Sequence, residues 1–259
     1  RGSSHVASAS VASNSTETIT LPWVADLKQV FGEEQSVNVA NGAYRVESDL
    51  PVTVYQFNPL EYGLNHDCAS EEGLDLDGVC YSFSNDASLL LPRHVLTEHY
   101  IAMSYPTLGI TQVLEDLWLG TTDYYYSFSP SMLAVVNPSD STVTVDVTFT
   151  APMQAGPGPT AYNAGQQGTF TIQAGGVLQL ATRMPEECVP TIQDEPIVDG
   201  DYRLTRGYCN LTELDFTGTE ISSSAPVAVF GGHNCSFVPY DRWACDHLEE
   251  QLFPYETWG

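Results

Sequence analysis

Alternation of apolar and polar residues recurs along this chain, and it constrains the fold more than any other feature. Residues 51–57, 142–149 and 168–172 all alternate with a period of two. Successive side chains of a strand point to opposite faces of a sheet, so this period predicts strands with one buried face. Helical spacing is confined to residues 111–118 and 241–252, the latter an amphipathic stretch. We therefore predict an all-β fold with one or two short helices.

Two turn signals interrupt the alternation and predict hairpins. The sequence Asn-Pro-Ser-Asp at residues 137–140 separates the apolar run at 132–136 from the alternating run at 142–149. A second signal, Ala-Gly-Gly at 174–176, follows the segment 168–172 and precedes another apolar run. Asn, Asp, Pro and Gly favour tight turns, so each pair of flanking runs is expected to form two adjacent antiparallel strands.

An internal repeat gives the expected domain organisation. Residues 48–55 (SDLPVTVY) align without a gap with residues 223–230 (SSAPVAVF), and a cysteine loop follows each copy. Such segments bury their valines on one face of a strand. Proline stands at the strand start, where no backbone N–H is needed for a hydrogen bond to the neighbouring strand. We predict two related β-sandwich-like units, residues 1–126 and 127–259. Each unit lacks strands at its outer end, so either the native chain extends further or the two copies share strands.

The charge of the chain excludes two classes of partner. It carries 8 Lys and Arg against 33 Asp and Glu, a formal net charge of −25. Binding nucleic acid or an anionic membrane requires basic residues that neutralise phosphates, so neither is expected. No apolar run approaches the roughly 20 residues of a membrane span, so membrane insertion is not expected either. Solubility is the simplest reason for such acidity, and calcium, a cationic partner or a salty medium are the alternatives.

Six cysteines indicate an oxidising, extracellular or cell-surface location. None forms a Cys-x-x-Cys pair, and they fall into three local couples, as in small disulfide loops. Free buried thiols are the alternative. Spacing alone does not determine connectivity, and we expect neighbours to pair. The expected bridges are Cys68–Cys80, Cys188–Cys209 and Cys235–Cys245.

The loop between the first two cysteines is a candidate calcium site. Asp75, Asp77 and the glycine that follows match the Asp-x-Asp-Gly fragment of calcium loops, and Asp67 and Glu71 supply further oxygens. The complete EF-hand spacing is absent. A solvated acidic loop closed by a disulfide is the simpler interpretation, so no cofactor is predicted, with calcium as the exception to test.

The second candidate site gathers His233, Asp246, His247, Glu249 and Glu250 near the last two cysteines. These residue types serve zinc hydrolases, which need two or three ligands and a carboxylate base. The His-Glu-x-x-His motif is absent, and so are nucleophile and phosphate-loop motifs. We favour a structural role, in which His233 and Asp246 bond to backbone and the glutamates face solvent. No enzymatic activity is predicted; a metal-dependent hydrolase centred on His233 and His247, with glycans among its substrates, is the alternative.

A run of three tyrosines, Tyr124, Tyr125 and Tyr126, is the third candidate. Exposed tyrosines stack on sugars or anchor a protein partner, whereas a strand of a covered sheet would half bury them. The sequence leaves these two interpretations open.

Four motifs, in the expected order, resemble the N-terminal domain family of the IgG Fc-binding proteins. They lie at residues 48–59, 84–92, 226–233 and 245–252. The resemblance implies a secreted or surface-displayed β module that binds or adheres to a protein or glycoprotein without catalysis. It does not imply that antibody is the ligand. The acidity and the sparse cysteines are more typical of a bacterial member, and further domains of the native chain are a second kind of expected partner.

Overall fold

The computed structural model describes residues 1–29, 31–57, 87–240 and 246–258, and it confirms the all-β prediction. Strands dominate, and the helices of the described residues are two 3-10 turns, η2 (Arg93–Val95) and η3 (Tyr255–Thr257). No described helix has the length and apolarity needed to cross a membrane. The strands are β1 (Val37–Val39), β2 (Tyr55–Phe57), β3 (Ala87–Leu89), β4 (His99–Ile101), β5 (Thr107–Asp116), β6 (Thr121–Ser129), β7 (Ser131–Val136), β8 (Val143–Thr148), β9 (Gln167–Ile172), β10 (Val177–Ala181), β11 (Ile192–Gln193), β12 (Ile197–Asp199), β13 (Tyr202–Leu211), β14 (Glu220–Ser223), β15 (Ala228–Ser236) and β16 (Asp246–Gln251).

Two antiparallel sheets form a β-sandwich around the main core. One sheet has the order β1-β10-β7-β15-β16, and the other has the order β4-β14-β8-β9. Alternate residues of their strands face inward, as the burial pattern of β7 and β8 shows, and they meet in one apolar cluster. Phe149 lies in this cluster against the rings of Tyr162, Phe170 and Phe216. This covered core supplies most of the apolar burial of the chain.

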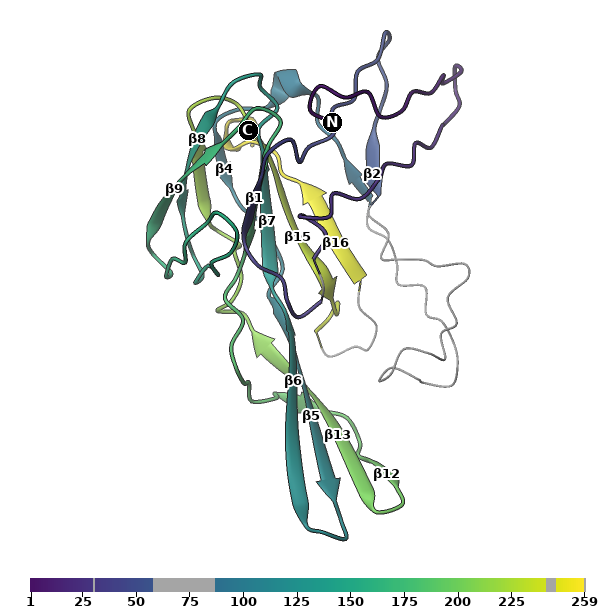
Figure 1. The fold of residues 1–259 in the computed structure, drawn as a ribbon, viewed down its shortest axis with the longest axis vertical. Coiled ribbons are helices and arrows are strands. Elements are labelled where there is room, and N and C mark those ends of the chain that lie inside the picture. Colours follow the sequence, from purple (N-terminus) through teal and green to yellow (C-terminus); the bar gives the residue numbers. More distant parts are fainter. Residues whose placement is uncertain (30, 58–86, 241–245, 259) are drawn as a thin grey trace.

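A third sheet extends away from the sandwich as an arm (Figure 1). Its order is β11-β13-β5-β6, and β12 also pairs with β13. The longest strands of the chain, β5 and β13, pair over ten residues without a register shift. Two small clusters pack the base of the arm, around Leu108 and Tyr208 on one side and around Phe128 and Cys209 on the other. We call β5, β6, β11, β12 and β13 the arm throughout.

The two copies of the repeat have different surroundings. The second copy ends in β15, where Val227 and Val229 are fully buried in the sandwich. In the first copy, Val52 and Tyr55 are exposed, and the short strand β2 pairs only with β3. The division into units 1–126 and 127–259 stays a prediction. Each sheet of the sandwich contains strands from both sides of residue 126, and that boundary falls inside β6.

Both helices were predicted at wrong positions. Residues 111–118 belong to β5 and the turn after it, and most of the described part of 241–252 is β16. Sheet pairing overrides local helix propensity in each case, because β5 lies between β6 and β13 and β16 extends the sheet beyond β15. Gly232 makes the second pairing possible, since a Cβ at that position would lie 2.3 Å from the carbonyl oxygen of Leu248.

The two predicted hairpins are also wrong. β7 pairs with β10 and β15, whereas β8 pairs with β9 and β14, so residues 137–140 cross from one sheet to the other. The Ala-Gly-Gly turn makes a second crossing, between β9 and β10. Asn137 stabilises these corners, because its side-chain amide donates to the carbonyls of Ser141, Ile172 and Gln173. Turn residues therefore identified where the chain reverses but not which strands pair.

Candidate functional site

His233 is a core histidine of β15. Its side chain is 1% exposed, and its Nδ1 accepts a hydrogen bond of 3.2 Å from the backbone N–H of Cys235. Burial lowers the pKa of His233 to about 3, against the opposing effect of the nearby backbone of Ser129 and Pro106. The ring is therefore neutral at physiological pH, with its proton on Nε2. This arrangement agrees with a structural role.

His247 lies on the opposite face of the same sheet. His233 is paired with Leu248, and side chains of directly paired residues share a face, so His247 and Glu249 point the other way. There, Nε2 of His247 lies 3.6 Å from a carboxylate oxygen of Glu249, which also accepts a hydrogen bond from Gln56. The sheet thus separates the two histidines on which the hydrolase alternative depends.

The remaining members of that cluster do not complete a metal site. Asp246 is paired with Ser236 and Glu250 with Gly231, both in strand geometry rather than on the predicted helix. Among the described residues, no group of three or more His, Cys, Asp or Glu side chains is arranged to hold a metal ion. The candidate calcium ligands Asp67, Glu71, Asp75 and Asp77 lie outside the described residues, and calcium binding stays a prediction.

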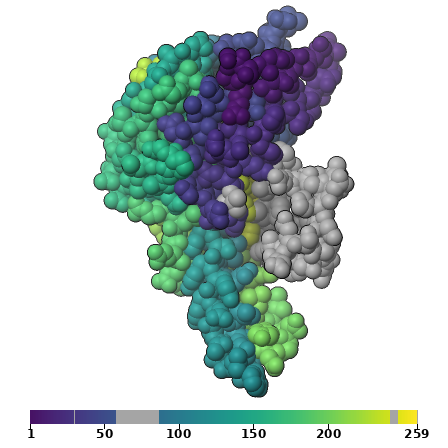
Figure 2. Space-filling model, in the orientation of Figure 1, coloured from purple at the N-terminus to yellow at the C-terminus, as the bar shows by residue number. Residues whose placement is uncertain are grey.

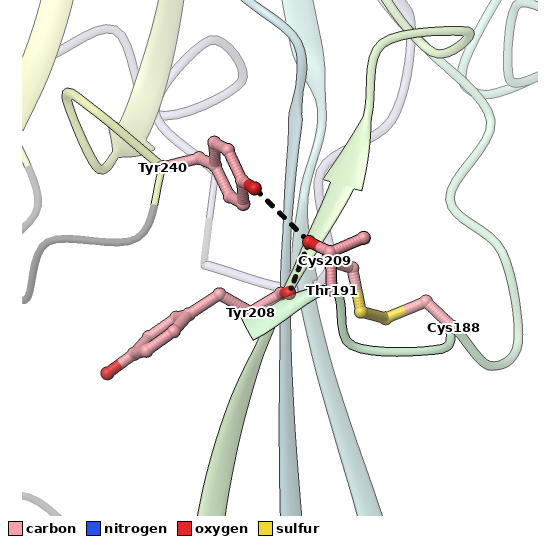
Figure 3. Close-up of a disulfide and its surroundings, with 5 residues drawn as sticks. All are labelled: Cys188, Thr191, Tyr208, Cys209 and Tyr240. Carbon is pink, nitrogen blue, oxygen red and sulfur yellow. Dashed lines mark hydrogen bonds between the residues drawn. A yellow bond between two sulfur atoms is a disulfide. The ribbon is translucent and has the colours of Figure 1, made fainter. Parts of the chain in front are cut away.

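The Cys188–Cys209 disulfide is present and ties the base of the arm to the loop after β10 (Figure 3). Beside it, the hydroxyl of Thr191 contacts both the carbonyl of Tyr208 and the hydroxyl of Tyr240, each at 3.2 Å. The predicted bridges Cys68–Cys80 and Cys235–Cys245 involve Cys68, Cys80 and Cys245, which lie outside the described residues. The observed disulfide anchors β13, the central strand of the arm.

The outer part of the arm has no buried residue. Residues 112–127 and 192–206 are all exposed or half-buried, although their backbones are paired in the sheet. Trp118 is 79% exposed at the tip, and Tyr124 and Tyr125 on β6 are 63% and 53% exposed. Figure 2 shows this part of the molecule standing clear of the rest. Its other large exposed apolar side chains are Leu117, Leu119, Ile192, Ile197, Val198 and Tyr202.

The tip of the arm is held in a defined conformation. A carboxylate oxygen of Asp116 accepts hydrogen bonds from the backbone N–H groups of Trp118 and Leu119, at 2.9 and 2.8 Å. Gly120 adopts a φ of +68°, which closes the turn, and its N–H donates to the carbonyl of Asp116. The backbone N–H of Leu117 donates to Asp201 on the neighbouring turn, at 2.6 Å. The indole is thus presented from an ordered turn.

Acidic side chains surround this apolar surface. The strands and turns of the arm carry seven carboxylates but only two basic residues, Arg203 and Arg206. Arg203 lies 3.4 Å from a carboxylate oxygen of Glu115. The seven carboxylates are Glu115, Asp116, Asp123, Asp194, Glu195, Asp199 and Asp201. The exposed face of the arm therefore combines aromatic and aliphatic anchors with a negative potential.

The tyrosines are recognisable in the sequence as a candidate binding surface, whereas the arm tip is not among the predicted sites. Trp118 was included in a predicted helix, so its exposure was not anticipated. The pattern Asp-Leu-Trp-Leu-Gly at residues 116–120 between two strand-forming segments was the available signal, since Asp and Gly bracket a tight turn. Of the tyrosines, Tyr124 and Tyr125 are exposed, whereas Tyr126 packs against the cluster at the base of the arm.

Comparisons with known proteins agree with the motifs in the sequence. The sequence model of the family described as IgGFc binding protein matches residues 86–259, about two-thirds of the chain. The chain is similar to a human protein named IgGFc-binding protein, with 38% identity over 48 residues. That match covers 18% of this chain and 1% of the human protein, so it spans only a small part of that relative. No solved structure matches the chain.

Proposed function

This chain belongs to the IgGFc-binding protein family, and from that premise we propose that it is a non-catalytic, extracellular or cell-surface module that binds a protein or glycoprotein partner through the arm. One observation carries the proposal: an ordered sheet displays a largely exposed tryptophan and two exposed tyrosines, and no layer of the described residues packs over them. Trp and Tyr are the residues most enriched among binding hot spots. Adhesion to a surface-displayed partner is the expected biological use.

The absence of catalysis is supported by the histidine geometry. A zinc hydrolase needs its ligands to converge on an open coordination position, whereas His233 is buried and His247 faces the other side of the sheet. Elemental analysis of the purified protein is expected to find no stoichiometric zinc. Tightly bound zinc that is lost in both His233→Ala and His247→Ala would overturn this part of the proposal.

Binding is tested first with the ligand that the human relative's name supplies, the Fc fragment of IgG, and with a Fab fragment as the negative control. Proteins from the native extracellular surroundings of the chain form the second panel. Each ligand that binds is titrated against the wild type, Trp118→Ser and Trp258→Ser. Trp258 is the matched control because it is also largely exposed but lies near the C-terminus, in the sandwich region.

Trp118→Ser is expected to weaken binding by at least about tenfold, because a hot-spot residue contributes about 2 kcal/mol or more. Trp258→Ser is expected to bind like the wild type. If Trp118→Ser and the wild type have equal affinity for every ligand that binds, the arm tip is not the binding site. A chain that retains no protein from either panel would overturn the binding function itself.

A further inference from the structure

The outer edge of β6 has no partner strand among the described residues. β6 is the last strand in the sheet order β11-β13-β5-β6, and only β5 pairs with it. Every second residue of an edge strand directs its backbone N–H and C=O away from the sheet. Residues 121–127 of β6 are exposed or half-buried, so these groups are open to another chain. The edge is therefore a template for one more strand.

Apart from the charge of Asp123, β6 lacks the sequence features that normally protect an edge strand. Its sequence, TTDYYYSFS, contains no proline, no lysine and no arginine. Its pairing with β5 runs through nine consecutive residue pairs without a bulge. Edge strands of soluble proteins are usually short, bulged, covered or guarded by lysine, because a long flat edge invites strand pairing. The part of this edge that is not buried, residues 121–127, fits a surface that is used for pairing.

From this geometry we propose that the partner adds an extended, lysine- or arginine-bearing segment to the free edge of β6. The proposal rests on the proposed function and names the mode of binding and the chemistry of the partner. Seven carboxylates on the arm and a net charge of −25 on the chain favour a cationic segment. Asp123, the single charged residue of β6, lies within the edge itself.

The two faces of β6 supply matching contacts for the side chains of the added strand. Tyr124 pairs with Val113, and Tyr125 pairs with Gln112, so the two tyrosines lie on opposite faces of the sheet. Alternate side chains of an added strand would meet one tyrosine or the other. Lysine and arginine gain by lying over tyrosine rings, in addition to their attraction to carboxylates. Strand addition thus gives affinity through the backbone and selectivity through these rings.

A second copy of the chain is a poorer occupant of the same edge. Each copy carries a net charge of −25, and a β6–β6 contact would bring two acidic arms together. Like charges held at close range oppose association. The added strand is therefore expected to come from a different protein of opposite charge.

The test uses the whole chain and three synthetic peptides of nine residues. The first alternates lysine and valine, and the second replaces each lysine by glutamate. The third keeps the lysines but carries N-methyl groups on alternate backbone amides, so it has the same charge and cannot complete a ladder. Calorimetric titration gives the affinities, and amide hydrogen exchange gives the residues protected by each peptide.

We expect the lysine peptide to bind at least about tenfold more tightly than either control peptide, a difference of about 1.4 kcal/mol. It should slow amide exchange at alternate residues between Thr121 and Ser127. Asp123→Lys, which adds an edge lysine, should abolish this protection. Asp199→Lys makes the same charge change on β12, elsewhere in the arm, and should leave the protection intact.

Equal affinity for the lysine peptide and its N-methylated form would overturn strand addition, because charge alone would then explain binding. Protection confined to the tip, or equal effects of Asp123→Lys and Asp199→Lys, would also overturn it. None of these results would contradict the proposed function if Trp118→Ser still lowers the affinity of the chain for a protein ligand. Self-association through β6, seen by analytical ultracentrifugation and lost in Asp123→Lys, would reject the cationic partner.

Discussion

Strands β6 and β7 follow one another along the chain with only Pro130 between them, yet their surroundings are opposite. In β7, Leu133 and Val135 are fully buried in the sandwich core. In β6, Tyr124 and Tyr125 are mostly exposed, and burial begins only at Phe128. The same stretch of chain thus leaves an uncovered sheet and enters a covered one. The difference is the presence of a second layer, supplied by β4, β8, β9 and β14 in the sandwich.

This comparison assigns different tasks to the two regions. Sheets are stabilised by packing a hydrophobic face against another layer. The sandwich has such a layer, whereas no described residues form one over the outer arm. The sandwich is therefore expected to determine the free energy of unfolding. The arm is expected to contribute recognition, with its hydrogen-bonded strands holding exposed side chains in place. Four measurements test this division, beginning with the largest expected effect.

Replacing Phe149 by alanine tests whether the sandwich carries the stability. Its ring is 1% exposed and contacts three other aromatic rings, so its loss should lower the free energy of unfolding by about 3–5 kcal/mol. Phe253→Ala is the matched control, because that ring is exposed and should change stability by less than about 0.5 kcal/mol. Urea denaturation measures both. Similar losses for the two variants would contradict the comparison.

Removing the Cys188–Cys209 disulfide tests how the arm is anchored. The bridge closes a loop with a sequence separation of 21. Chain-entropy arguments give about 3 kcal/mol for such a loop, so Cys188→Ala combined with Cys209→Ala should lower unfolding stability by roughly that amount. Hydrogen exchange should show the loss first in β13 and β5. If amide hydrogen exchange became faster by the same factor in the sandwich and in the arm, the disulfide would not anchor the arm separately.

Acidification tests the neutral histidine of the sandwich. The pKa of His233 is about 3 when folded, below its ordinary value near 6.5 in an unfolded chain. The unfolded state therefore binds the proton first, and stability falls as the pH drops through the window between these values. From pH 7 to pH 5, His233 should account for a loss of ~2 kcal/mol.

The control for this measurement is His233→Asn, whose side-chain oxygen can accept the N–H of Cys235 but cannot be protonated in this range. Urea unfolding at several pH values compares the slopes of stability against pH. The variant should have the flatter slope between pH 7 and 5. Identical slopes would show that His233 does not lose its proton on folding.

The fold class was predictable because period-two alternation is a local property of the chain. Residues 142–149, for example, were correctly identified as strand, and β8 occupies most of that segment. The pairing of strands was not predictable, since it depends on contacts far apart in the sequence. Residues 137–140 look like a hairpin turn, yet they connect the two sheets, and β7 finds its partners 40 to 100 residues later. The predicted helix at 241–252 failed for the same reason, because pairing with β15 decides its conformation.

The site was predictable only where chemistry is visible in the residue types. The tyrosines were identified, and the structural interpretation of His233 followed from the lack of a metal motif. The exposure of Trp118 was missed because a tryptophan next to leucines is normally a sign of burial, although the flanking Asp116 and Gly120 indicate a turn. Trp118 is exposed because the arm extends away from the sandwich (Figure 1). The proposed binding surface therefore depends on which strands lack a second layer, a property that local sequence patterns do not carry.

The smallest expected effect is on stability when the arm loses its tyrosines. In the double variant Tyr124→Ser with Tyr125→Ser, the side chains removed are mostly exposed, and on β5 they are paired with Val113 and Gln112. Cross-strand pairs contribute about 0.2–1 kcal/mol each, so unfolding stability should fall by no more than about 1 kcal/mol. Ligand affinity should fall by a larger factor, because the tyrosines face the partner in the proposed mode of binding. A loss of stability comparable with that of Phe149→Ala, measured by the same urea denaturation, would show that the arm is part of the cooperative core and that its tyrosines serve folding rather than recognition.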